Sequence, residues 1–243
     1  MGRYLFGVAA LMLGIASLAL HQQLASEWRL PGTAAFLWVT SIAQIVGGIA
    51  LLFSKTDRLG AAVLGGVYAL FALTLVPDIF AQPGVYASWG NLFYQLALVV
   101  GACVAYGLAA SSAPYAKTIC KAAVVLFGLC NISFAIEQVE FLARTVSLVP
   151  KWVPPNGMFW AIATTLAFGL AGVSMLIGCK SLLASRLLTV MLLIFVITIW
   201  IPLLIADPKT LSNWSEGIVT FAIAGAAWIV VDFLALPRPS TNP

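Results

Sequence analysis

Eight apolar runs, each near the length of a membrane-spanning helix, constrain this chain more than any other feature of its sequence. A helix needs about 20 apolar residues to cross a bilayer core of about 30 Å. The runs are too long for outer-membrane barrel strands and lack the alternation that such strands show. We therefore predict an all-α integral membrane protein whose eight transmembrane helices lie near residues 4–22, 34–53, 58–77, 90–110, 118–140, 157–178, 185–205 and 215–234.

The composition excludes a soluble protein. Hydrophobic residues make up 62% of the 243 residues and charged residues only 8%. A soluble domain of this size could not keep such a surface in water. The lipid bilayer is therefore the first expected partner.

The chain carries an internal duplication. Four residues recur at an offset of 125: Pro77, Ala81, Pro83 and Trp89 return as Pro202, Ala206, Pro208 and Trp214. The block Ser17–Gln22 returns as Ser133–Gln138. Each copy holds four apolar runs, so both copies enter the membrane from the same side. We predict two parallel four-helix repeats, residues 1–112 and 113–243, joined by the short stretch 110–115.

The duplication also bears on the first apolar run, which together with Arg3 resembles a secretory signal. Its counterpart at 118–140 lies in the middle of the chain, where no signal peptide can be. We expect the first run to be a retained helix.

Lysine and arginine are unequally distributed between the two sides of this arrangement. One side has eight of them with two acidic residues, and the other has four with six acidic residues. The larger basic set is Arg3, Lys55, Arg58, Lys117, Lys121, Lys180, Arg186 and Arg238. The positive-inside rule then places both termini in the cytoplasm. The net charge of +4 is thus an orientation signal, and no nucleic-acid partner is expected.

Ionisable residues near membrane depth are the first candidates for a site, because each costs about 2.5 to 3.5 kcal/mol at the centre of a membrane helix. Here they gather on the outer side, beside the proline-rich outer loops 30–32 and 149–155. Glu140 and Arg144 have the i, i+4 order that favours an ion pair. The candidate ligand-binding residues are His21, Gln22, Glu137, Gln138, Glu140, Arg144 and Trp152.

The duplication places His21 and Glu137 at the same position of the two copies. One hypothesis is a proton-handling or ligand-anchoring pair at the outer mouth of the seam between the halves. The alternative is that both residues lie at headgroup level, solvated, and merely end their helices. The sequence leaves both interpretations open.

Small residues and prolines predict details of the architecture. Gly47-Gly48 and Ala171-Gly172 are expected where helices pack closely. Pro77 and Pro202 stand near the outer ends of the third and seventh runs. A proline there is expected to stop the helix, because it cannot continue the hydrogen-bond ladder.

The chemical groups of common membrane enzymes are missing. The four cysteines form no Cys-x-x-Cys pair, and none lies in an outer loop. One histidine cannot supply bis-histidine haem ligation, and no zinc-binding spacing occurs. Neither a phosphate-binding loop nor a Gly-x-Ser-x-Gly elbow is present. We expect no metal, no catalytic residues and no independent catalytic activity.

Several stretches together resemble the DoxX-like membrane proteins. They are the proline-rich loop Leu148–Pro154, the aromatic entry Met158-Phe159-Trp160, Phe127-Gly128, Gly169–Gly172, and Trp200–Pro202 leading to Trp214. The second half carries this resemblance better, and the first half is a more diverged copy. The resemblance implies two tandem four-helix units in the cytoplasmic membrane of a bacterium. Members of this group have been linked to a membrane subunit of thiosulfate:quinone oxidoreductase and to complexes for oxidative-stress defence.

Three functions follow as expectations. The resemblance implies a non-catalytic or accessory component of a membrane redox system that binds a quinone-like or lipidic molecule at the outer side, with quinone as the one candidate cofactor. The alternative is a structural or assembly subunit of a larger membrane complex, with other membrane subunits or a second copy of the chain as partners. A small-solute transporter ranks third, because polar residues near the midplane are nearly absent.

Overall fold

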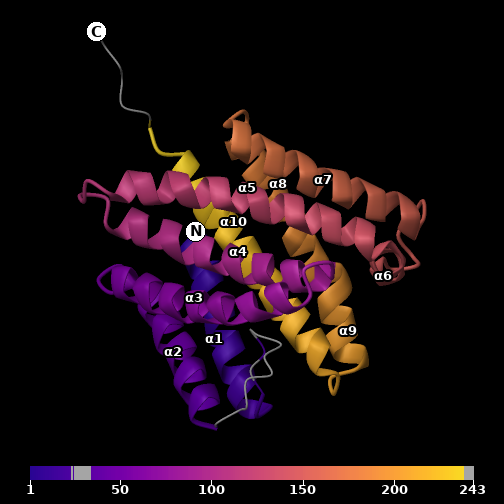
Figure 1. Ribbon diagram of the computed structural model, residues 1–243, viewed down its shortest axis with the longest axis horizontal. Helices are drawn as coiled ribbons and strands as arrows, with labels where there is room; N and C mark the ends of the chain where they lie inside the picture. The colour runs from indigo at the N-terminus through magenta and orange to yellow at the C-terminus, as the bar shows by residue number, and fades with distance from the viewer. Residues whose placement is uncertain (23, 25–33, 238–243) are drawn as a thin grey trace.

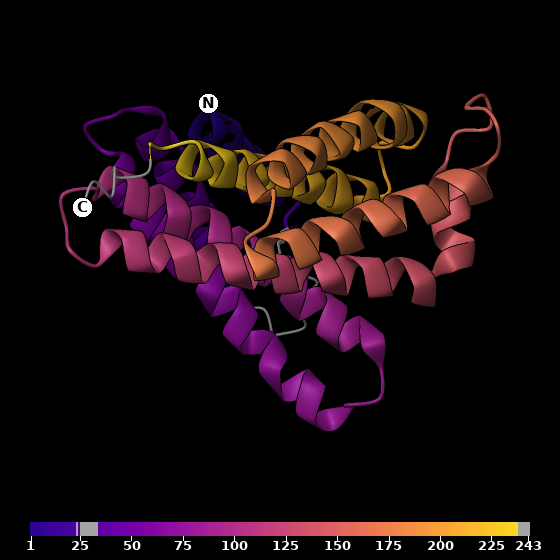
Figure 2. The same cartoon turned by 90° about the horizontal axis from the view of Figure 1, so that it is seen from above.

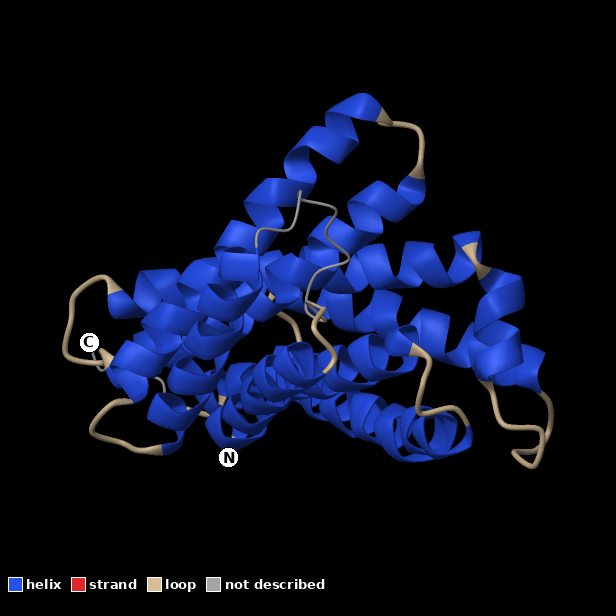
Figure 3. Ribbon diagram, turned by 90° about the horizontal axis from the view of Figure 1, so that it is seen from below, coloured by secondary structure: helices blue, strands red, loops and turns tan. Residues whose placement is uncertain are grey.

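The computed structural model describes residues 1–22, 24 and 34–237, and every regular element within them is a helix (Figure 1, Figure 3). The predicted loop at 30–32 and Arg238 lie outside the described residues. The helices are α1 (Gly2–Ala19), α2 (Ala34–Leu52), α3 (Asp57–Ala81), α4 (Tyr86–Ala109), α5 (Ala116–Glu140), α6 (Leu142–Leu148), α7 (Gly157–Ile177), α8 (Ser181–Phe195), the π-helical turn η1 (Val196–Trp200), α9 (Ile201–Ala206) and α10 (Leu211–Leu234).

Eight of these helices are long and apolar enough to span a membrane, with α8, η1 and α9 forming one continuous span, Ser181–Ala206. The eight predicted runs each coincide with one of these spans. The short helix α6 was not predicted, because the fifth helix was expected to continue as far as Arg144.

The helix α10 forms the centre of the bundle. It packs against α1, α4 and α8, and 72% of its apolar window is buried (Figure 1). Around it, α1 packs on α2, α3 on α2 and α4, and α5 on α4 and α7. Small residues along α10, such as Ala222, Ala226 and Gly225, let the neighbouring backbones approach closely.

The ends of α1, α3 and α10 are held together by charge. The N-terminal ammonium of Met1 lies 3.1 Å from the carboxylate of Asp232, and Arg3 lies 2.6 Å from the carboxylate of Asp57. The start of α1 therefore sits beside the end of α10, as the label N and the yellow helix show in Figure 2.

Two pairs of glycines bring helices into close contact, as predicted for Gly48 and Gly172. A Cβ atom on Gly48 would lie 2.7 Å from the carbonyl oxygen of Gly7, where α2 crosses α1. A Cβ atom on Gly172 would lie 2.7 Å from the carbonyl oxygen of Gly128, where α7 crosses α5. Real Cβ atoms do not approach a backbone oxygen so closely, so both crossings require glycine.

The prediction that Pro77 and Pro202 stop their helices is wrong. Helix α3 runs through Pro77 to Ala81, and α9 continues from η1 with Pro202 in its first turn. In η1 the N–H of Ile201 bonds to the carbonyl of Val196, five residues back. This wider turn opens the helix where proline lacks its N–H, and such local π adjustments let membrane helices tolerate proline.

Tryptophan side chains shape three of the connections between helices. In each, the indole N–H donates to the carbonyl oxygen of a proline six residues earlier, at 2.8 to 3.1 Å. The pairs are Trp89 with Pro83, Trp160 with Pro154, and Trp214 with Pro208. Each bond fixes the connection against the first turns of the helix that follows it.

Candidate functional site

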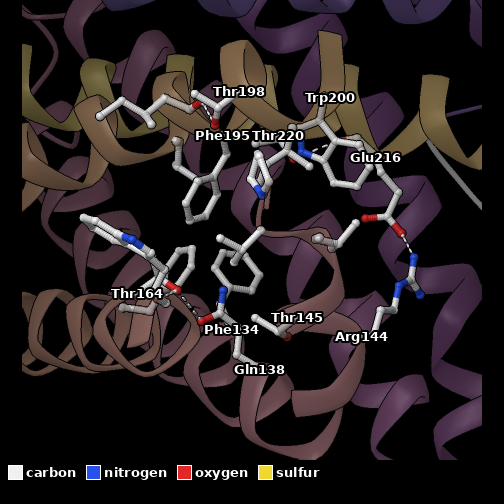
Figure 4. A pocket seen from close by; sticks show the side chains of 18 of the residues that line it. Phe134, Gln138, Arg144, Thr145, Thr164, Phe195, Thr198, Trp200, Glu216 and Thr220 are labelled. Atoms are coloured by element: carbon white, nitrogen blue, oxygen red, sulfur yellow. Dashed lines mark hydrogen bonds and ion pairs between the residues drawn. The ribbon is translucent and has the colours of Figure 1, made fainter. Parts of the chain in front are cut away.

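A cavity of about 420 Å³ lies within the second half of the chain. It is enclosed by α5, α6, α7, the span from α8 to η1, and α10, with Tyr94 of α4 also on its wall. Figure 4 shows its residues facing one another across an open centre, with α5 to α7 below and η1 to α10 above. Its volume falls in the range of about 300 to 1,000 Å³ that is typical of small-molecule sites.

The cavity lies toward one end of the bundle, which we call the α6 end because α6 flanks it. Its lining residues on α10 run from Glu216 near the start of that helix to Ile223. Seven residues of helix span about 10 Å. The cavity therefore reaches from the end of the helices well into their apolar part.

A chain of aromatic rings forms the deeper wall. The ring of Tyr94 lies 5.0 Å from that of Phe134, Phe134 lies 5.6 Å from Phe168, and Phe168 lies 6.5 Å from Phe195. The rings come from four helices, α4, α5, α7 and α8. Such a wall favours a flat apolar ligand, because aromatic rings prefer offset or edge-to-face contacts at these separations.

Polar side chains line the part of the cavity nearest the α6 end. They include two carboxyl groups, one guanidinium, one amide and several hydroxyls: Glu137, Glu216, Arg144, Gln138, Thr145, Thr164, Thr198 and Thr220. The cavity is thus amphipathic, with apolar rings deep inside and hydrogen-bonding groups toward its end.

The amide of Gln138 contacts two hydroxyls of α7. Its Oε1 atom lies 3.1 Å from the hydroxyl of Thr164 and 2.9 Å from that of Thr165. The same hydroxyls lie 2.9 and 2.7 Å from the carbonyl oxygens of Trp160 and Ala161, and each has one proton to donate. Gln138 is half-buried on the cavity wall, where its amide is within reach of a ligand (Figure 4).

An ion pair joins two sides of the cavity. Arg144 on α6 donates to the carboxylate of Glu216 on α10 at 2.8 Å (Figure 4). The predicted partner of Arg144 was Glu140, and that prediction is wrong. Helix α5 ends at Glu140 and α6 begins at Leu142, so residues 140 and 144 do not lie one turn apart on a single helix. Glu140 is exposed instead.

Four of the seven candidate residues from the sequence line this cavity: Glu137, Gln138, Arg144 and Trp152. Glu137 is half-buried. Its carboxyl group lies beside Gly90 of α4, so that a Cβ atom added to Gly90 would be 3.4 Å from it. His21, Gln22 and Glu140 are exposed and are not among the lining residues. The pairing of His21 with Glu137 stays a prediction.

Comparisons with protein-family models, with curated proteins and with solved structures found no match.

Sequence reasoning missed most of the lining residues. Phe134, Phe168 and Phe195 resemble any other apolar residue in a membrane helix, so composition gives no signal for them. Glu216 and Thr220 stand four residues apart and so share one face of α10. Such a polar pair on one face of a membrane-spanning helix is a signal that could have been used.

Proposed function

We propose that this chain is a DoxX-like membrane protein made of two parallel four-helix units. The first unit is α1 to α4, and the second is α5, α7, the α8–α9 span and α10. Equivalent neighbours pack alike: α1 on α2 and α5 on α7, α3 on α4 and α8 on α10. Between the units, the contact of α4 with α5 is equivalent to that of α10 with α1, and α10 also packs on α4.

Matched residues support the same division. The Gly7–Gly48 crossing and the Gly128–Gly172 crossing occupy equivalent places and have the same pair of close approaches, 3.0 and 2.7 Å. The bonds of Trp89 and Trp214 to prolines also fall 125 residues apart. From the distribution of positive charge we propose that both termini lie in the cytoplasm and that the protein is located in the bacterial cytoplasmic membrane.

We further propose that the protein binds a membrane-resident amphipathic molecule, quinone-like or lipidic, as an accessory component of a membrane redox system. The observation that carries this is the amphipathic cavity, with aromatic rings at its inner wall and hydrogen-bonding groups at the α6 end. An apolar pocket with a few convergent polar groups is the usual form of a small-molecule site. In this orientation the α6 end faces the outer side of the membrane.

The test is a search for the bound molecule in protein purified in mild detergent. Mass spectrometry of the solvent extract is expected to find an amphipathic molecule in stoichiometric amount. A Thr198→Trp variant should lose it, because Thr198 lines the cavity and an indole there would fill it.

The matched control is Ile197→Trp. Ile197 is the adjacent residue of η1, is 62% exposed and does not line the cavity. This variant should keep the molecule. Extracts with no such molecule from wild-type protein, or equal loss in both variants, would contradict the proposal.

A further inference from the structure

The end of the bundle opposite the α6 end, which we call the basic end, carries more positive charge than its own carboxylates balance. Its two acidic residues are both bonded to cations: Asp232 to the N-terminal ammonium of Met1 at 3.1 Å, and Asp57 to Arg3 at 2.6 Å. Six more cationic side chains there form no ion pair with any described residue: Lys55, Arg58, Lys117, Lys121, Lys180 and Arg186. Such an excess of positive charge favours anions from outside the chain.

Among these six described side chains, Arg58 alone is held by hydrogen bonds to other side chains. Its Nη2 atom donates to the hydroxyl oxygen of Tyr106 at 3.0 Å and to that of Tyr115 at 3.1 Å. Its guanidinium carbon lies 5.1 Å from the centre of the Tyr106 ring, a cation–π contact. Tyr106 belongs to α4 and Tyr115 to the connection between α4 and α5. The guanidinium of α3 is therefore held against two other parts of the chain.

This arrangement leaves hydrogen-bond donors available. A guanidinium has five N–H groups, and the tyrosines take the two on Nη2. The three on Nη1 and Nε have no acceptor among the described residues. Asp57, the preceding residue, accepts from the backbone N–H of Arg58 and from Arg3 instead. Charged N–H donors without a carboxylate are suited to the oxygens of a phosphate group.

The tyrosines add a donor of their own. Both hydroxyl oxygens accept from Arg58, so their protons are not used on it. The two hydroxyls also contact each other, which takes one proton and leaves the other to donate. Arg58, Tyr106 and Tyr115 together thus present several donors and a positive charge at one place.

Exposed apolar side chains flank this place. Phe53, in the turn before α3, and Leu59, next to Arg58, are each 62% exposed. Arg58 lies in the first turn of α3, which is long and apolar enough to span a membrane. Phosphate groups and acyl chains of a bilayer meet at the ends of such spans. A phospholipid uses both the donors and the apolar surface, whereas a free phosphate ion uses only the donors.

From these contacts we infer a second binding site, at the basic end, in which Arg58, Tyr106 and Tyr115 bind the phosphate group of an anionic phospholipid. Lys55 and Lys117 stand three and two residues from Arg58 and Tyr115 and add positive charge. That charge favours phosphatidylglycerol over the zwitterionic phosphatidylcholine. The site goes beyond the proposed function, because it lies at the opposite end of the bundle from the cavity and needs no ligand there.

The test is native mass spectrometry of protein purified in mild detergent and titrated with each of these two lipids. Wild-type protein should bind one phosphatidylglycerol molecule about fivefold to tenfold more tightly than phosphatidylcholine. Thr198→Trp, which fills the cavity at the other end, should leave this difference unchanged. Loss of cavity binding and loss of lipid binding are therefore separate results.

Arg58→Gln should weaken phosphatidylglycerol binding about tenfold and leave phosphatidylcholine binding unchanged. Arg186→Gln is the matched control, since it removes the same charge from an exposed arginine of the same end. It should change either affinity less than about twofold. A double variant, Tyr106→Phe with Tyr115→Phe, keeps every charge and both rings but releases the guanidinium. It should weaken phosphatidylglycerol binding about threefold.

Three results would overturn the inference. Equal affinity of wild-type protein for the two lipids would show that the head is not selected. Equal weakening by Arg58→Gln and Arg186→Gln, with no effect of the double tyrosine variant, would show diffuse attraction by the whole basic end. Displacement of phosphatidylglycerol by an equal concentration of inorganic phosphate would show a site for the free ion rather than for a lipid.

Discussion

Arg144 and Glu216, 72 residues apart in the sequence, form an ion pair of 2.8 Å that joins α6 to α10 beside the cavity. The side chains are 63% and 27% exposed. Exposed pairs of this kind contribute little to stability, because water and salt screen them. The pair therefore matters for the shape and charge of the cavity more than for holding the bundle together.

Replacing Arg144 by alanine should lower the free energy of unfolding by less than about 1 kcal/mol. Unfolding in mild detergent, followed by circular dichroism at low and high salt, measures this. The difference from wild type should shrink as salt is raised. A loss of several kcal/mol that does not depend on salt would show that the pair is a structural clamp.

Gly172→Ala should destabilise the protein by about 1 to 3 kcal/mol. The added methyl group would lie 2.7 Å from the carbonyl oxygen of Gly128, and backbone atoms cannot move aside easily. The thermal unfolding midpoint of the purified variant measures the effect.

Gly169→Ala on the same helix is the matched control. The nearest atom to its added methyl group would be 3.8 Å away, an ordinary contact. Alanine also has a higher helix propensity than glycine, so this variant should be as stable as wild type or slightly more stable. Equal destabilisation by both substitutions would contradict the close crossing of α5 and α7.

Trp214→Phe should cost about 0.5 to 1.5 kcal/mol of stability, the net contribution of one hydrogen bond. Phenylalanine keeps most of the ring but cannot donate to the carbonyl of Pro208. Chemical denaturation compared with wild type gives the difference. Trp152→Phe serves for comparison, since that indole is 73% exposed and should change stability far less.

The sequence predicted the helices well because each apolar run has the length that a bilayer demands. The close contact at Gly48 and Gly172 could also be predicted, since small residues in membrane helices usually mark crossings. The effect of Pro77 and Pro202 on their helices was predicted wrongly, because it depends on the backbone conformation of the helical turn around each proline. The wide turn of η1 has no signature in the residues Val196–Trp200.

The site was predicted only in part. Gln138 and Arg144 stand out because polar residues are rare in this chain. The partner of Arg144 could not be predicted, because the break between α5 and α6 at Phe141 directs Arg144 toward α10. The aromatic wall depends on four helices that meet only in the folded protein.

Photoaffinity labelling tests the central claim most directly. A decyl-tailed benzoquinone that carries a diazirine on its tail would be activated in the purified protein, and the labelled peptides would be sequenced by mass spectrometry. The cavity predicts that labels concentrate in 134–153, 192–200 and 216–223 and disappear in the Thr198→Trp variant. Labels spread over exposed apolar residues such as Leu170 and Ile177, unchanged by Thr198→Trp, would contradict a binding site in the second half of the chain.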